Sequence, residues 1–154
     1  MQDGVAYLTF NDQGGPRGGR EVGSQNWWMG MAQRPMAKGT LRINLMFSME
    51  PATVGKNGYR ELFQAGETYQ GAALIDRQHP HEFLMQATAA WHVPVKGANV
   101  TVVGAAAGEP ALGPVAFMHR RSAFENPTAP LGHHTFDSTH IAMGVLTTSV
   151  ERGA

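Results

Sequence analysis

Two histidine clusters carry the residues of this chain that are best suited to chemistry. The first extends from Asp76 to Glu82 and contains His79 and His81. The second occupies residues 133–140, and its candidate ligands are His133, His134, Asp137 and His140. Neutral imidazole and carboxylate oxygen are the usual ligands of zinc and similar ions when no thiol is present. The clusters therefore predict a site for a divalent metal ion, with zinc as the first choice and calcium or another divalent ion as alternatives.

The spacing of His79 and His81 favours a shared ligand. Side chains two residues apart on an extended backbone point to the same side, and Pro80 keeps the preceding residue extended. The two imidazoles are therefore expected to converge on one ion, with the remaining ligands supplied by the cluster at 133–140. Such a combination is typical of a catalytic zinc site with an open coordination position.

Charged residues beside the histidines supply the other roles that hydrolysis needs. A bound divalent ion lowers the pKa of its water and makes hydroxide available for attack on an ester, a lactone or a phosphoester. Asp76 or Glu82 would act as general base or orient a histidine, and Arg77 or Arg120 would polarise a substrate oxygen. The leading hypothesis is thus a metal-dependent hydrolase that acts on an ester-like bond of a small-molecule substrate.

Less specific interpretations apply to parts of the same pattern. Clustered His, Asp, Ser and Thr also build hydrogen-bond networks in loops. His119 is balanced between metal ligand and structural histidine, whereas His92 is expected to be structural. Ser122 and Ser138 are candidate nucleophiles of a serine hydrolase, which ranks lower because the sequence has no Gly-x-Ser-x-Gly motif.

Composition limits the remaining classes. The chain has 154 residues, enough for a single domain over 1–154. Lys plus Arg and Asp plus Glu both number 12, so no basic face favours nucleic acid. The charged fraction of 16% is low. Because a weakly charged surface gives little protection against self-association, we expect a homo-oligomer. The sequence has no cysteine, so a disulfide or a thiolate metal site is excluded. The N-terminal residues do not have the pattern of a signal peptide. No segment is a long enough apolar run for a membrane helix.

The clearest structural pattern is the alternation at residues 40–50. Apolar side chains from Leu41 to Met49 alternate with mostly polar ones, which predicts a strand with one apolar and one largely polar face. Further strands are expected at residues 5–10, 99–107 and 141–148. Residues 83–93 fit either a strand or a helix, with a helical start favoured by Ala and Gln. One short helical turn is expected around Tyr59, Leu62 and Phe63, and residues 11–20 read as a glycine-rich loop. The fold class is therefore mainly β, with antiparallel strands in a barrel-like or open sheet, long ordered loops and one short helix.

Several longer motifs extend across most of the chain. They are QAGET at 64–68, DRQHPH at 76–81, GEPALGP at 108–114, FMHR at 117–120 and HHTFDSTH at 133–140. Together they resemble a family of uncharacterised bacterial proteins that look like outer-membrane β-barrels and are often encoded beside metal-resistance genes. The members are longer, begin with an export signal and are expected in the bacterial envelope.

The resemblance has two departures. The chain lacks the export signal and the C-terminal half of the family pattern, and residues 149–154 no longer match it. It is therefore expected to be a piece of that pattern, with an apolar outer face and strand edges covered by self-association, and with membrane association only if it keeps barrel character. The resemblance favours a second hypothesis: a non-catalytic metal-binding or structural fragment of a bacterial envelope β-barrel protein.

Overall fold

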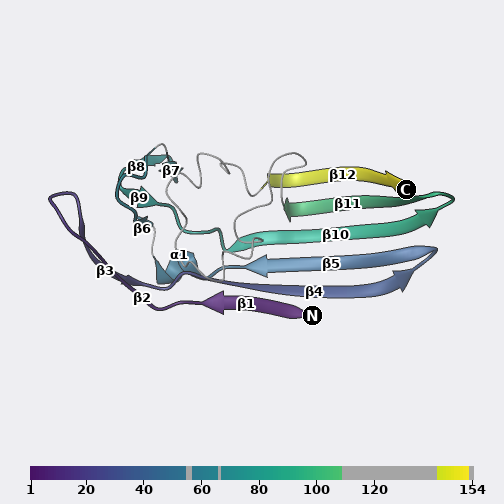
Figure 1. Ribbon diagram of the computed structural model, residues 1–154, viewed down its shortest axis with the longest axis horizontal. Helices are drawn as coiled ribbons and strands as arrows, with labels where there is room; N and C mark the ends of the chain where they lie inside the picture. Colours follow the sequence, from purple (N-terminus) through teal and green to yellow (C-terminus); the bar gives the residue numbers. More distant parts are fainter. Residues whose placement is uncertain (55–56, 66, 109–141, 153–154) are drawn as a thin grey trace.

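A six-stranded antiparallel sheet forms most of the molecule (Figure 1). The computed structural model describes residues 1–54, 57–65, 67–108 and 142–152. The strands follow the order β1 (Gln2–Ala6), β4 (Asn26–Met36), β5 (Gly39–Phe47), β10 (Leu84–Val95), β11 (Ala98–Gly108) and β12 (Ala142–Arg152). The predicted class, mainly β with antiparallel strands, is confirmed in the form of an open sheet.

One end of the sheet is closed by short turns. Ala37 and Lys38 alone connect β4 to β5, and Lys96 and Gly97 alone connect β10 to β11. Ala37 and Gly97 adopt positive φ values of 54° and 76°. Two-residue connections of this kind fix the register of a hairpin. As a result, side chains of neighbouring strands lie in regular cross-strand rows.

The opposite end carries a loop region, formed by the described parts of residues 7–25 and 48–83 (Figure 1). Three small antiparallel pairs and one helical turn build it. The pairs are β2 (Thr9–Gln13) with β3 (Gly19–Gly23), β6 (Tyr59–Arg60) with β9 (Arg77–Gln78), and β7 (Glu67–Tyr69) with β8 (Ala72–Leu74); the turn is α1 (Glu50–Thr53). In Figure 1 the β2–β3 hairpin projects beyond the sheet, and β12 ends toward the short turns, whereas the N-terminus lies beside the middle of β4.

The structure corrects three local predictions. The helical start expected within residues 83–93 is wrong, because β10 pairs along its length with β5 and β11 and this pairing overrides the helix propensity of Ala and Gln. The one short helix forms at Glu50–Thr53 rather than at Tyr59–Phe63, with Pro51 in its first turn, where proline is well tolerated. The glycine-rich segment is a hairpin, since both of its flanks pair as strands.

The apolar core is small and lies at the junction between the sheet and the loop region. Trp27, Met46 and Met85 are buried together, and Val5 and Met29 pack against them. We call the face of the sheet that carries Trp27 and Met46 the inner face, and the opposite face the outer face.

No helix within the described residues is long and apolar enough to cross a membrane.

Candidate functional site

The two faces of the sheet are reversed relative to a sheet that packs on an apolar core. On the outer face of β5 the exposed side chains are apolar, with Ile43 42% and Leu45 40% accessible to solvent. On its inner face Arg42 is the exposed side chain. The alternate positions lead to Met46, Ser48 and Glu50, which are at most 1% exposed. The strand therefore turns its polar side inward, apart from Met46, and presents its apolar side outward.

The same alternation crosses the whole sheet. Register places Ala32, Ile43, Ala89, Gly104 and Leu146 in one cross-strand row of the outer face. Leu146 is 76% exposed and Val150 is 60% exposed. Other outer-face side chains at alternate positions are apolar or small: Gly30, Leu41, Val93, Val100 and Val102. The outer face is thus mainly apolar, and Gln2, Arg34 and Thr148 are polar positions on it.

Aromatic side chains flank this surface at two levels. Toward the turn end, Trp91 lies opposite Leu41 and donates a hydrogen bond from its indole to the backbone oxygen of Met36 at 3.3 Å. Toward the loop region, Trp28 stacks on Phe47 with ring centroids 6.2 Å apart, and Phe47 contacts Phe83 at 5.4 Å. The Trp28 indole donates to Gln2 Oε1 at 3.2 Å. Each of these two outer-face indoles therefore combines an apolar ring with a satisfied polar end.

The inner face is lined mainly by polar side chains and small residues. Arg42, Asn44, Gln86, Thr88, His92 and Thr147 share one cavity of about 420 Å³ with small and apolar neighbours. His92 Nδ1 lies 2.9 Å from Thr101 Oγ1, which ties the imidazole to the neighbouring strand. This pair agrees with the structural role expected for His92.

In the loop region, a buried carboxylate connects three segments of the chain. Glu50 is fully buried, and its Oε2 accepts a 2.9 Å hydrogen bond from the backbone N–H of His81 and lies 2.8 Å from His81 Nδ1. Its Oε1 accepts a 3.2 Å bond from the backbone N–H of Asn26. A buried carboxylate is tolerated only when such partners compensate for the lost hydration. Glu50 therefore fixes the first histidine cluster to the start of β4.

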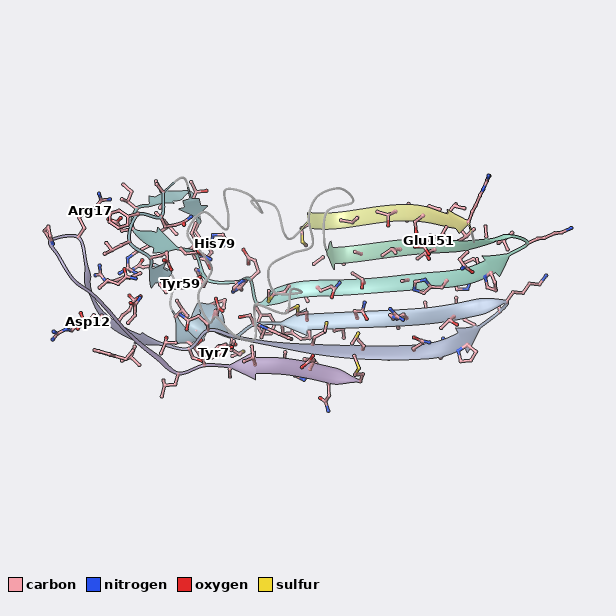
Figure 2. The ribbon with its side chains drawn as sticks, viewed as in Figure 1. Tyr7, Asp12, Arg17, Tyr59, His79 and Glu151 are labelled. Atoms are coloured by element: carbon pink, nitrogen blue, oxygen red, sulfur yellow. The ribbon has the colours of Figure 1, made fainter. Side chains whose placement is uncertain are left out.

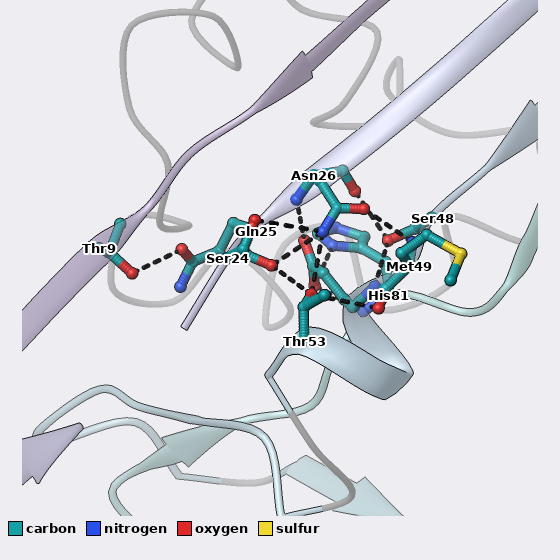
Figure 3. A network of polar contacts seen from close by, with 9 residues as sticks. Thr9, Ser24, Gln25, Asn26, Ser48, Met49, Thr53 and His81 are labelled. Carbon is teal, nitrogen blue, oxygen red and sulfur yellow. Dashed lines mark hydrogen bonds and ion pairs between the residues drawn. The ribbon is translucent and has the colours of Figure 1, made fainter. Parts of the chain in front are cut away.

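Hydrogen bonds around Asn26 extend this connection. Ser48 Oγ donates to the backbone oxygen of Asn26 at 2.7 Å, and the Asn26 side chain accepts from the backbone N–H of Met49 at 2.7 Å. Thr53 Oγ1 donates to the backbone oxygen of Ser24 at 2.6 Å. Figure 3 shows these groups converging between β4 and α1. The network holds the chain at the point where the sheet passes into the loop region.

Asp76 organises a second polar contact in the loop region. Its Oδ1 accepts a 2.9 Å bond from the backbone N–H of Phe63, and its Oδ2 lies 2.5 Å from Arg17 Nε. The Phe63 hydrogen bond lowers the pKa of the Asp76 carboxyl below its ordinary value; the Arg17 guanidinium adds to this, while partial removal from water opposes it. The Asp76 carboxylate is therefore an ionised structural acceptor that links the β2–β3 hairpin to residues 60–64.

Arg77 lies in an ion-pair cluster on Glu21. Its Nη1 donates to the backbone oxygen of Gly58 at 2.8 Å and lies 3.6 Å from Glu21 Oε2. The same carboxylate accepts a short hydrogen bond from the backbone N–H of Arg60 and lies 3.8 Å from Arg60 Nε. Arg77 thus joins β3 to the β6–β9 pair.

The structure gives His79 and His81 different neighbours. The His79 ring stacks on Tyr69 with centroids 6.1 Å apart and an angle of 4° between planes, whereas His81 faces Glu50. Figure 2 shows His79 beside the loop-region strands. Glu82 is exposed. In the described part of the chain, no group of three or more His, Asp or Glu side chains could hold a metal ion.

Most of the predicted ligands lie outside the described residues. These are His119, His133, His134, Asp137 and His140, together with the predicted substrate-polarising residue Arg120 and the candidate nucleophiles Ser122 and Ser138. The metal site and its hydrolytic chemistry therefore stay predictions.

Sequence reasoning did not identify Glu50, Asn26 or Arg42 as organising residues. A signal for Glu50 was present, because it occupies the polar side of the alternation at residues 40–50 and directly precedes Pro51. Asn26 has no comparable signal, since two of its partners, Met49 and Thr53, lie far along the chain.

Comparison with known protein families, with curated proteins and with solved structures finds no match to this chain.

Proposed function

We propose that the six-stranded sheet forms part of the wall of a bacterial envelope β-barrel, with its outer face against lipid and its inner face toward a polar interior. The observation that carries this proposal is the reversed sheet, in which the outer face exposes large apolar side chains while the opposite face is mostly polar. Alternation of this sense is the signature of membrane barrels, because lipid replaces the apolar core as the environment of one face.

Strand length supports the proposal. β4, β5, β10, β11 and β12 have 11, 9, 12, 11 and 11 residues. A tilted strand needs roughly 9–11 residues to cross the hydrocarbon region. These strands are also longer than the usual globular strand of about 5–6 residues.

The aromatic side chains support the same orientation. Trp91 and the Trp28–Phe47–Phe83 group lie toward opposite ends of the apolar surface. Membrane barrels carry aromatic residues at both interfaces, where a ring can contact lipid while its polar end meets water. Short turns at one end and a large loop region at the other match the periplasmic and extracellular ends of such barrels.

The outermost strands β1 and β12 each have one side that no other strand of the described sheet pairs. An exposed strand edge recruits further strands, so a complete wall requires additional strands at both edges. Strands from a second copy of the chain would meet this requirement, in line with the expected homo-oligomer. Cross-linking in detergent micelles, followed by mass measurement, would detect it.

Lipid contact can be tested with the three tryptophans, which lie on different faces. Single-tryptophan variants are made by replacing the other two with Phe, and each is mixed with vesicles of ordinary or brominated lipid. Trp28 and Trp91 should be quenched by bromine because they lie on the outer face, whereas Trp27, 4% exposed in the core, should be protected.

Circular dichroism provides the folding control for each variant. Equal quenching of Trp27 and Trp28 in a folded protein would contradict the proposal, because the two faces would then not differ in lipid access. Absence of quenching at both Trp28 and Trp91 would also contradict it.

A further inference from the structure

The inner face contains a polar cavity that the wall role alone does not explain. Its volume is about 420 Å³, and its walls come from β5, β10, β11 and β12. Among the lining residues, register sets Arg42 opposite the small side chain of Ala90, which in turn lies opposite Val103. A long cationic side chain opposite a small residue leaves open space beside the guanidinium.

The described lining of the cavity carries positive charge without a compensating negative charge. Arg42 is the one permanently charged side chain among its lining residues within the described chain, and neither Asp nor Glu lines it. The surrounding polar groups include amides and hydroxyls that can donate hydrogen bonds: Asn44, Gln86, Thr88, Thr147 and Ser149. A guanidinium without a carboxylate partner, surrounded by neutral donors, favours an anionic ligand.

The Arg42 guanidinium is also held in position. Gln33 Oε1 accepts hydrogen bonds from Arg42 Nη2 at 3.2 Å and from Nε at 3.4 Å. Gln33 lies opposite Arg42 on β4, so the contact uses one edge of the guanidinium. The N–H groups of Nη1 stay available for a ligand, and pre-orientation reduces the entropy lost when one binds.

We propose that this cavity binds a small oxyanion of the phosphate class, with Arg42 as the charged donor and Asn44 and Thr88, which register pairs in the neighbouring row, as neutral donors. The inference rests on the proposed function for its setting, because the inner face would then line the interior of the barrel wall. Free phosphate and the phosphate group of a small solute present the same oxygens to Arg42, and the binding test distinguishes the two sources.

The binding test uses the full chain in detergent micelles. Inorganic phosphate is titrated at constant ionic strength by calorimetry, and phosphorylcholine is titrated separately to distinguish a free ion from a substituted phosphate. R42Q should weaken phosphate binding by roughly 10- to 100-fold, the equivalent of one hydrogen-bonded charge. R42K should fall between R42Q and the native protein, because lysine keeps the charge but loses the planar fork.

R34Q is the matched control. Arg34 lies on β4 next to Gln33, and alternation places it on the outer face opposite Leu41. R34Q therefore removes the same formal charge from the other side of the same strand pair, and phosphate affinity should change by less than about twofold, as for a remote screened charge.

Three outcomes would overturn the inference: no phosphate binding by the native protein, unchanged affinity in folded R42Q, or equal losses in R42Q and R34Q. These results are separable from the lipid test. Quenching of Trp28 and Trp91 without phosphate binding removes the oxyanion site and leaves the wall proposal intact. Arg42-dependent phosphate binding without quenching supports the site and removes its membrane setting.

Discussion

The sheet and the loop region differ in which side chains they expose and which they bury. In the sheet, large apolar side chains such as Leu45 and Leu146 are exposed on the outer face. In the loop region, the buried side chains are mainly polar or charged: Gln25, Ser48, Glu50, Gln64, Asp76, Gln78 and His81. Under the proposed function, the sheet depends on an apolar environment outside the protein, whereas the loop region depends on internal hydrogen bonds and charge pairs.

This difference predicts different sensitivities. Changing the medium from water to lipid should affect the outer face, because only there do side chains exchange one solvent for the other. Deleting a polar partner should affect the loop region in either medium, because its buried groups have lost hydration and need protein partners. The predictions below test these sensitivities in order of expected effect.

The largest loss of stability is expected from Glu50→Ala. The substitution removes the carboxylate that makes three contacts, two with His81 and one with the backbone N–H of Asn26. Each buried donor left without its acceptor costs about 1–3 kcal/mol in the free energy of unfolding, and Glu50 accepts from two backbone N–H groups as well as facing the His81 ring. Denaturant titration would measure it.

Glu82→Ala is the control for that experiment, because Glu82 is exposed in the same cluster. A surface substitution of this kind should change stability by less than about 0.5 kcal/mol. Similar losses in the two variants would show that Glu50 does not anchor the loop region.

A matched pair on β12 tests the sheet. Leu146 lies in the outer-face row, and its neighbour Thr147 lines the inner cavity. Leu146→Lys should cost about 2–4 kcal/mol for folding into a bilayer, since a lysine then faces hydrocarbon near the middle of the strand. Thr147→Lys should cost clearly less, because a lumen-facing lysine stays in a polar environment.

Both variants would be compared by urea titration in thin-bilayer vesicles. Equal costs at the two positions would contradict the assignment of inner and outer faces. In aqueous solution the exposed Leu146 position should tolerate lysine, which separates the effect of lipid from the effect of packing.

Part of this arrangement was predictable from the sequence. The period-two pattern at residues 40–50 identified β5 and its two faces, because strand alternation is a local property. The pattern did not show which face of the strand is buried by the protein and which is exposed, since that depends on the surrounding medium and on segments far along the chain. The local pattern of residues 83–93 was likewise compatible with two structures, and cross-strand pairing decided between them.

The candidate site was less predictable for a related reason. The cluster around His81 was recognisable by residue type, but its partner Glu50 lies 31 positions earlier, and its amide neighbour Asn26 lies on another strand. Residue types identify groups that need partners, whereas the fold decides which partners they receive. Arg42 carried no motif, and it became a candidate only when register placed it beside Gln33 and opposite Ala90.

Backbone packing in the loop region gives a smaller expected effect. A Cβ at Gly58 would lie 1.9 Å from the backbone oxygen of Gln78, and Gly58 has a φ of 66°. Gly58→Ala should therefore destabilise by about 1–3 kcal/mol through strain at the β6–β9 pair. Gly71 has a φ of 81° but open space around it, so Gly71→Ala carries the conformational cost without the clash. Thermal unfolding should show the larger loss for Gly58→Ala, and the reverse order would contradict the close backbone approach.

The smallest effect concerns the pH dependence of the loop region. Because the pKa of Asp76 is lowered in the folded protein, its contribution to stability is present above the ordinary aspartate pKa of about 3.9 and is lost as pH falls through the lowered value. Hydrogen exchange at the Phe63 amide, corrected for the intrinsic pH dependence, reports on this bond directly. Protection should decline in acid in the native protein and should be lower at neutral pH, with a weaker acid decline, in Asp76→Asn.

Glu61 should act with the opposite sign. Burial raises the pKa of its carboxyl, so its contribution to stability is present below the ordinary glutamate pKa and is lost as pH rises through the raised value. It therefore partly offsets the acid loss caused by Asp76, and Glu61→Gln should make the decline at Phe63 steeper. An unchanged or shallower profile would show that these two carboxyls do not set the acid response of the loop region. The outer-face positions of the sheet, which carry no carboxylate in the row from Ala32 to Leu146, should keep their protection in lipid over the same pH range.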